Sequence, residues 1–97
     1  MERQLAIGAL AALAQETRLD VFRLLVRAGS EGLAAGAVGV ALGLPPATLS
    51  FHLKELKSAG LVRCEHAGRS RIYTPSFAVV KELVDYVMED CCQGATD

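Results

Sequence analysis

The chain has 97 residues and a mass of 10.3 kDa, a length that suits one small domain and excludes an enzyme built from two lobes around a cleft. Hydrophobic residues make up 52% of the chain and aromatic residues 5%, and alanine and leucine together supply 29 of the 97 residues. This composition favours helix over sheet or disorder. We therefore predict a single, mainly helical domain over residues 1–97, and so apolar a chain indicates a second buried face, as in a homodimer.

Charge is distributed unevenly along the chain. Residues 1–47 have a net charge of 0, residues 48–74 of +3 and residues 75–97 of −4, which gives the formal total of −1. The overall charge argues against a nucleic-acid partner, but the basic middle third of the chain is compatible with one.

The cysteine content predicts a cytoplasmic protein without a membrane partner. Three cysteines, an odd number, do not form a disulfide framework, and 22% of the residues are charged. The uncharged run from Leu5 to Ala14 ends in an Ala-Leu-Ala sequence that resembles a signal-peptide cleavage site. Its leading segment, however, sets Glu2 against Arg3 and lacks the positive charge of such peptides. The run is also too short to span a bilayer.

Apolar residues at helical spacing predict three helices in the first half of the chain. The first covers about residues 2–14, and the second follows the polar break at 15–17 and ends at Gly29 and Gly32. The third, over Leu33–Leu42, is rich in alanine and glycine and is ended by Gly43. The expected apolar stripes are Leu5, Ala9, Leu10 and Leu13 in the first helix and Leu19, Phe22, Leu25 and Val26 in the second.

A fourth helix is expected from Pro45-Pro46 to Gly60, because proline is tolerated in a first helical turn. Leu49, Leu53 and Leu56 recur at i, i+4 and i+7 and should face the core. The other faces of this helix carry hydroxyl, aromatic, imidazole and ammonium groups, from Thr48, Ser50, Phe51, His52, Lys54 and Lys57.

A β-hairpin and a last helix should complete the domain. Residues 61–66 and 71–74 have strand character and flank a turn at 67–70 that contains Gly68, and Pro75 ends the second strand. The last helix is expected over residues 76–91. Its apolar stripe consists of Phe77, Val80, Val84, Val87, Met88 and Cys91.

This order of elements, α-α-α-α-β-β-α with a small hairpin, predicts a winged helix-turn-helix. The polar groups of the fourth helix suit base edges and phosphates, and Arg69 and Arg71 on the hairpin would reach the DNA backbone or the minor groove. The alternative is that Lys54, Lys57 and the two arginines are an ordinary solvated face. Their clustering beside a helix-turn-helix favours DNA binding.

The chain resembles the ArsR/SmtB family of bacterial metal- and metalloid-responsive repressors over nearly its whole length. The stretches that carry the resemblance are Ala-Leu-Ala-Gln-Glu-Thr-Arg-Leu at 12–19, Ala-Leu-Gly-Leu at 41–44, Thr-Leu-Ser-Phe-His-Leu-Lys-Glu-Leu at 48–56 and Ala-Gly-Leu-Val at 59–62. The resemblance implies a homodimer, paired through the first and last helices, that places two recognition helices on a palindromic operator in double-stranded DNA.

The resemblance also implies which residues meet DNA. Thr48, Ser50 and His52 match recognition-helix positions, and Arg69 and Arg71 match wing positions. Phe51 departs from the polar residue or histidine common at its position, although an exposed phenylalanine still suits a thymine methyl group. For His52 the alternative is a capping or backbone-bonded imidazole.

Several metal sites of the family are missing from this sequence. Ala34 and Gly36 stand where a Cys-x-Cys site in the third helix would place its thiolates. The last helix holds no histidine, which disfavours a zinc site there despite Asp85 and Glu89. The adjacent pair Cys91-Cys92 remains as the candidate sensor.

Paired thiolates are soft ligands, and the resemblance implies that such a pair near the end of the last helix binds trivalent arsenic or antimony as an inducer, with no catalytic cofactor. Inorganic arsenite sites in the family usually recruit a third thiolate, whereas a methylated arsenical needs two, so both ligands stay open. Cys64, the remaining thiol, is expected to pack within the hairpin. A structural alternative is that Cys91 extends the apolar stripe and Cys92 is incidental.

Other functions are consistent with the same fold. A ligand-independent or thiol-redox regulator is one, although Glu89, Asp90 and the helix dipole favour protonated thiols and disfavour a fast peroxide sensor. A dimeric protein-interaction module is another, and it predicts binding that does not depend on salt. We do not expect an enzyme, because Cys64 and His66 share a strand face but lack an evident third group to orient a hydrolase pair.

Overall fold

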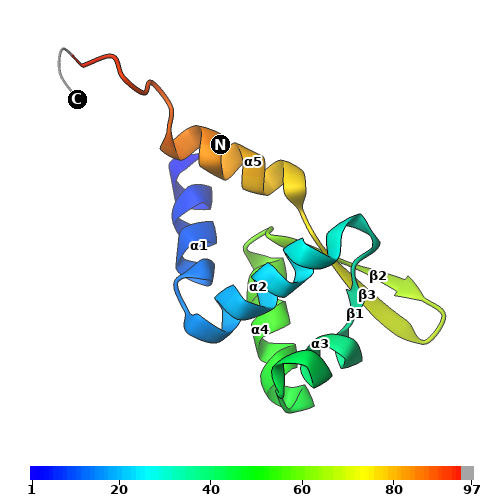
Figure 1. The fold of residues 1–97 in the computed structure, drawn as a ribbon. Helices are drawn as coiled ribbons and strands as arrows, with labels where there is room; N and C mark the ends of the chain where they lie inside the picture. The colour runs from blue at the N-terminus through cyan, green and yellow to red at the C-terminus, as the bar shows by residue number, and fades with distance from the viewer. Residues whose placement is uncertain (95–97) are drawn as a thin grey trace.

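A computed structural model describes residues 1–94 (Figure 1). It confirms a mainly helical winged helix-turn-helix with a small antiparallel sheet. Residues 95–97 of the predicted domain lie outside the described residues. The elements in chain order are α1 (Arg3–Leu13), α2 (Glu16–Ala28), the 3-10 turn η1 (Gly29–Glu31), β1 (Leu33–Ala34), α3 (Ala35–Leu42), α4 (Pro46–Ser58), β2 (Val62–Ala67), β3 (Ser70–Pro75) and α5 (Phe77–Val87).

The helix-turn-helix unit is formed by α3 and α4, whose axes differ by 115°, within the range of such motifs. The predicted stop at Gly43 is confirmed: this residue has φ +65°, and Leu44 N donates to Gly39 O at 3.0 Å. Such a left-handed residue closes the helix and satisfies its last carbonyls. The three leucines predicted to face the core from α4, Leu49, Leu53 and Leu56, are all buried.

The wing is the predicted hairpin. Strands β2 and β3 pair antiparallel from Val62↔Pro75 to Ala67↔Ser70, which leaves Gly68 and Arg69 as a two-residue turn. The sequence did not predict β1, which pairs with β3 through Leu33↔Tyr73 and Ala34↔Ile72. The third helix therefore begins at Ala35 and not at Leu33, because these two residues are extended in the sheet.

Gly32 lies where the chain enters β1 and passes close to β3. Its φ is +71°, and a Cβ atom added there would lie 2.5 Å from Tyr73 O and 2.5 Å from Thr74 Cγ2. Side-chain-bearing residues are strained in this conformation, and the backbone oxygen of β3 has no flexible side chain that could give way. The sheet therefore requires glycine at this position.

We expect Gly32→Ala to lower the free energy of unfolding by about 2–5 kcal/mol, the combined effect of backbone strain and overpacking. The matched control is Gly36→Ala in α3, where an added Cβ meets nothing within 4 Å. That substitution should be neutral or stabilising by up to about 1 kcal/mol. Urea denaturation of both variants measures the difference, and equal stabilities would contradict the close approach of Gly32 to β3.

The inward faces of α1 and α2 differ from the predicted stripes. In α1 the buried side chains are Ala6, Ala9 and Ala12, whereas Leu5 is 62% exposed and Leu10 is also exposed. In α2, Phe22 and Leu25 are buried as expected, but Leu19 and Val26 are exposed and Val21 is buried in their place. Because α1 is apolar on nearly every face, its spacing alone did not identify the face that packs inward. Small alanines allow α1 to approach the other helices closely.

The last helix is shorter than predicted. α5 ends at Val87 rather than at residue 91, so Cys91 and Cys92 lie beyond it in a turn. Its buried residue is Leu83, and the expected stripe lies mostly outside the core: Phe77, Val84, Val87 and Met88 are exposed. Within residues 1–94 no single helix is long and apolar enough to cross a membrane; only α3 and α4 taken together, across their bend, match such a span in length and composition.

Candidate nucleic-acid interface

The recognition helix α4 presents most of the predicted DNA-contacting residues to solvent. Thr48, Ser50, Phe51, Lys54 and Lys57 are exposed on it, and Arg69 and Arg71 are exposed on the wing. Figure 1 shows the wing extending away from the helices as a separate projection. These placements agree with the predicted surface, and contact with DNA stays a prediction.

His52 is the exception, because the prediction that it lies on an exposed face is wrong. It is 8% exposed, and among the described residues its Nδ1 is buried without a hydrogen-bond partner. The physical reason is helical geometry: His52 lies beside Leu53 and one turn from Leu49 and Leu56, the leucines that define the inner face of α4. The Phe51 ring packs edge-on against it at 5.4 Å between centroids. His52 is therefore better placed to position α4 than to read a base edge.

A hollow of about 270 Å³ lies between the recognition helix and the wing. It is lined by Ser50, Lys54 and Lys57 from α4 and by Arg71 and Tyr73 from β3. The α4 residues are four and three positions apart and so share one face of the helix. The β3 residues are two apart and share one face of the strand. Three cationic side chains and two hydroxyl-bearing side chains, from separate elements, thus line one hollow.

Tyr73 is a site residue that the sequence analysis missed. It is buried, and it faces its cross-strand partner Cys64 in the β2–β3 register. Burial and then the Cys64 side chain raise the pKa of the Tyr73 hydroxyl, while the neighbouring Arg71 opposes them. The phenol is thus a neutral donor near neutral pH. The alternation Arg71, Tyr73 on one strand face was the available signal. Cys64 itself is half-buried against the core, as predicted.

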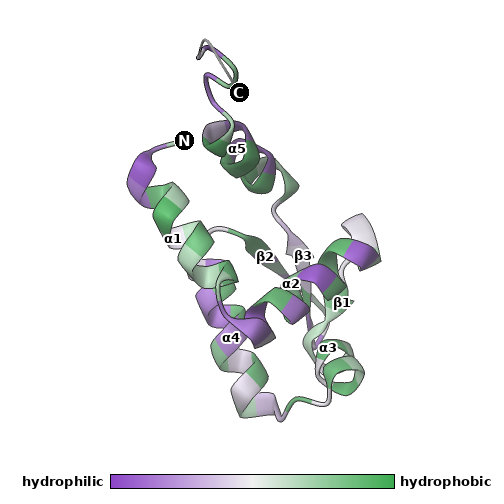
Figure 2. Cartoon of the chain, turned by 60° about the vertical axis from the view of Figure 1, so that its left-hand side comes forward, coloured by the Kyte–Doolittle hydropathy of each residue, from purple (hydrophilic) through white to green (hydrophobic). Residues whose placement is uncertain are grey.

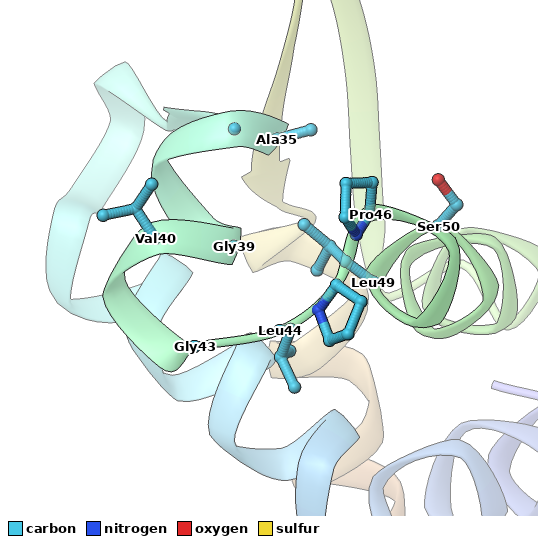
Figure 3. A pocket seen from close by; sticks show the side chains of 10 residues that line it. Ala35, Gly39, Val40, Gly43, Leu44, Pro46, Leu49 and Ser50 are labelled. Atoms are coloured by element: carbon cyan, nitrogen blue, oxygen red, sulfur yellow. The ribbon is translucent and has the colours of Figure 1, made fainter.

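A larger groove of about 490 Å³ separates α3 from the start of α4 (Figure 3). In that view Gly39 and Ala35 form one side, and Pro46, Leu49 and Ser50 lie opposite. Its lining is almost wholly apolar, and the nearby Val40 is 86% exposed. The groove thus differs from the basic hollow in chemistry, because no charged side chain lines it.

Helices α1 and α5 pack against each other and carry an exposed apolar face (Figure 2). Both helices are coloured largely as hydrophobic in that view. The exposed side chains are Leu5, Ile7 and Leu10 from α1 and Phe77, Val84, Val87 and Met88 from α5. So large an unpartnered apolar surface is typical of a protein–protein interface.

The candidate metalloid ligands lie next to this face. Cys91 and Cys92 follow α5 in a turn in which Asp90 and Cys92 have positive φ, and the structure joins their sulfur atoms as a vicinal disulfide. Cys91 N donates to Met88 O at 3.0 Å. Among residues 1–94, no three His, Cys, Asp or Glu side chains converge as they would around a metal ion. Asp85 pairs with Lys81, at 2.7 Å between Oδ2 and Nζ.

Comparisons with known proteins support this interface. A family model described as a helix-turn-helix domain matches residues 13–65. HlyU from Vibrio cholerae N16961 is 30% identical over 96% of this chain and 100% of its own, with a TM-score of 0.73. No curated protein sequence matches the chain significantly.

Two further solved structures are similar. One is the homodimeric winged helix-turn-helix DNA-binding domain of a possible ArsR-family transcriptional regulator from Mycobacterium bovis, 28% identical over 88% of this chain and 83% of that one, with a TM-score of 0.69. The other is a possible transcriptional regulator for arsenical resistance, 26% identical over 86% of each chain, with a TM-score of 0.67.

Proposed function

Because the chain belongs to the ArsR family of helix-turn-helix transcriptional regulators, we propose that it is a repressor that binds a palindromic operator as a homodimer. We further propose that trivalent arsenic or antimony, bound at Cys91 and Cys92, releases it from DNA. The observation that carries DNA binding is the hollow between α4 and the wing, where three cationic side chains meet. A local concentration of positive charge next to a recognition helix fits the phosphate backbone of DNA, although the whole chain is slightly acidic.

The homodimer is supported by the exposed apolar face of α1 and α5. In a single chain this face leaves large side chains such as Leu5, Val84 and Val87 in water, and pairing with a second copy would bury them. The similar domain from Mycobacterium bovis is a homodimer. A two-fold dimer presents its two recognition helices symmetrically, as a palindromic operator requires.

The inducer proposal rests on the chemistry and place of Cys91 and Cys92. Adjacent thiolates suit a thiophilic ion, and the pair follows α5 directly, at the edge of the proposed dimer face. Ligation there would change the end of that face and so the relative tilt of the two DNA-binding units. A coupling of about 1–3 kcal/mol changes operator affinity by roughly 5–150-fold. One relative is a possible regulator for arsenical resistance.

The expected result is release of DNA by an arsenical, and only through the reduced pair. Fluorescence anisotropy measures the affinity for a duplex that the protein selects from a random pool, with and without arsenite or methylarsenite. A phosphine reductant keeps the thiols free, because a dithiol would compete for arsenic. We expect the arsenical to weaken the operator affinity of the wild type by roughly 5–150-fold. The operator affinity of Cys91→Ser and of Cys92→Ser should not change.

Cys64→Ser is the matched control, since it removes a thiol from the wing instead. A response lost in Cys64→Ser as well would mean that a third thiolate is recruited. DNA binding that ignores both arsenicals would refute the inducer and leave the repressor. By linkage, operator DNA must weaken arsenical binding by the same factor.

A thiol-redox regulator is the second candidate, because Cys91 and Cys92 are adjacent and their sulfur atoms lie close enough to be joined on oxidation. Trivalent arsenic binds thiolates, so the oxidised pair would be closed to it. In this alternative the oxidised and reduced proteins differ in operator affinity without any arsenical. The same anisotropy measurement on peroxide-treated protein distinguishes the two candidates.

A further inference from the structure

The hollow between α4 and the wing has the composition of an anion site. Lys54, Lys57 and Arg71 supply positive charge, and Ser50 and Tyr73 supply hydroxyl groups. Hydroxyls and cationic N–H groups all donate hydrogen bonds, so their arrangement complements an anion with several oxygen acceptors. Arg69, at the tip of the wing, does not line the hollow and stays available for another contact.

Tyr73 makes this hollow more than a patch of surface charge. It is 9% exposed, so its ring is fixed by packing, and it nevertheless lines the hollow. Its hydroxyl lies beside the Arg71 side chain, and burial raises its pKa, which keeps its proton in place as a donor. Because packing holds the Tyr73 ring, its side chain loses little conformational freedom when the hydroxyl binds a ligand.

We propose that the hollow seats a single phosphate group of the DNA backbone, with the Tyr73 hydroxyl as a hydrogen-bond donor at its base. This proposal rests on the proposed repressor function, and it identifies one group of the DNA that the hollow binds. Because every nucleotide carries this phosphate, the hollow fixes the position of the wing relative to α4 and carries no base specificity. Tyr73 is thereby a binding residue of the DNA interface.

The first test compares substitutions on the face of the hairpin that lines the hollow with substitutions on the opposite face. Tyr73→Phe keeps the ring and removes the donor, and we expect about tenfold weaker binding to selected and unrelated duplexes alike. Arg71→Gln should weaken binding and lower the salt slope by up to about 1.8, because a dimer loses two arginines. Their controls, Thr74→Val and Arg63→Gln, remove a hydroxyl and a charge from the neighbouring, opposite-facing positions. These controls should bind within about twofold of wild type.

The second test identifies the phosphate. Single neutral methylphosphonate substitutions are scanned along the selected duplex. At one position in each half-site, Tyr73→Phe and the wild type should bind the modified duplex with equal affinity. The phosphate that Tyr73 would contact is already neutral there, so removing the hydroxyl causes no further loss. A tenfold loss on every modified duplex would overturn the phosphate seat while leaving DNA binding intact. Thermal unfolding of Tyr73→Phe verifies that the variant is folded.

A final arm separates this proposal from the repressor function. If the wild type selects no duplex, the repressor function fails, and titration with inorganic phosphate followed by amide NMR decides on the hollow. Shifts at Arg71 and Tyr73 that disappear in Tyr73→Phe would support an anion seat with another phosphate ligand. Their absence would overturn it.

Discussion

Replacing Val84 with aspartate is expected to turn the dimer into monomers and to weaken operator binding more than 100-fold. Val84 is 55% exposed on α5, within the apolar face shared with α1. In a dimer, aspartate would bury an unpaired charge, which costs several kcal/mol. A monomer then loses the gain from binding two half-sites together, a factor of about 10²–10⁴. Sedimentation velocity and anisotropy measure the two effects.

The matched control for this prediction is Val26→Asp. Val26 is also an exposed valine within a helix, but it lies on α2, outside the α1–α5 face. It carries the same change in charge and a similar cost in helix propensity. This variant should remain a dimer that binds the operator. If Val84→Asp remains a dimer too, the interface lies on another surface.

Raising the salt concentration from 50 to 200 mM is expected to weaken DNA binding about 150-fold. In the proposed complex each protomer would place one phosphate in the hollow and a second at Arg69, so a dimer would neutralise four. The slope of log K against log salt is then about −3.6. Anisotropy titrations at several salt concentrations give this slope directly. A protein-interaction module predicts no such dependence, and a slope flatter than −1 would favour that alternative.

The recognition helix and wing were predictable because their signals are local. Leu49, Leu53 and Leu56 stand at a spacing that admits one inward face, and Gly43 and Gly68 occupy the two turns. Strand β1 was not predictable in this way. It has two residues, and it is a strand only because β3, some 40 positions later, supplies its partner.

The two site residues that the sequence misplaced have a common physical explanation. His52 is polar by composition but lies beside three inward-facing leucines, and the geometry of α4 decides its burial. Tyr73 was taken only as part of a strand, yet the same sheet that buries it also turns it toward α4. In each case the residue type suggested one environment, and its position on a face required the other.

For α5 the predicted apolar side is correct, but its environment is not the expected one. The spacing of Phe77, Val84 and Val87 indicated one apolar side, as observed, but that side is exposed in the single chain. Periodicity identifies a face that avoids water and does not identify what covers it. The last helix was predicted about one turn too long, so Cys91 lies beyond the end of α5 and not on its apolar stripe.

The pairing of β1 with β3 divides the molecule by local stability. Leu33 and Tyr73 close a loop that contains α3, α4 and β2. Helix α2 precedes this loop but packs against α4 and β3, whereas α1 and α5 lie outside it near the two ends of the chain. Within the loop, unfolding any part disrupts the sheet that holds it, so amide exchange there should require nearly global opening. The two ends have fewer partners within one chain and open at lower cost until a second protomer covers them. In the proposed dimer, association would therefore stabilise the two end helices, while the DNA-reading unit should already be stable in the single chain.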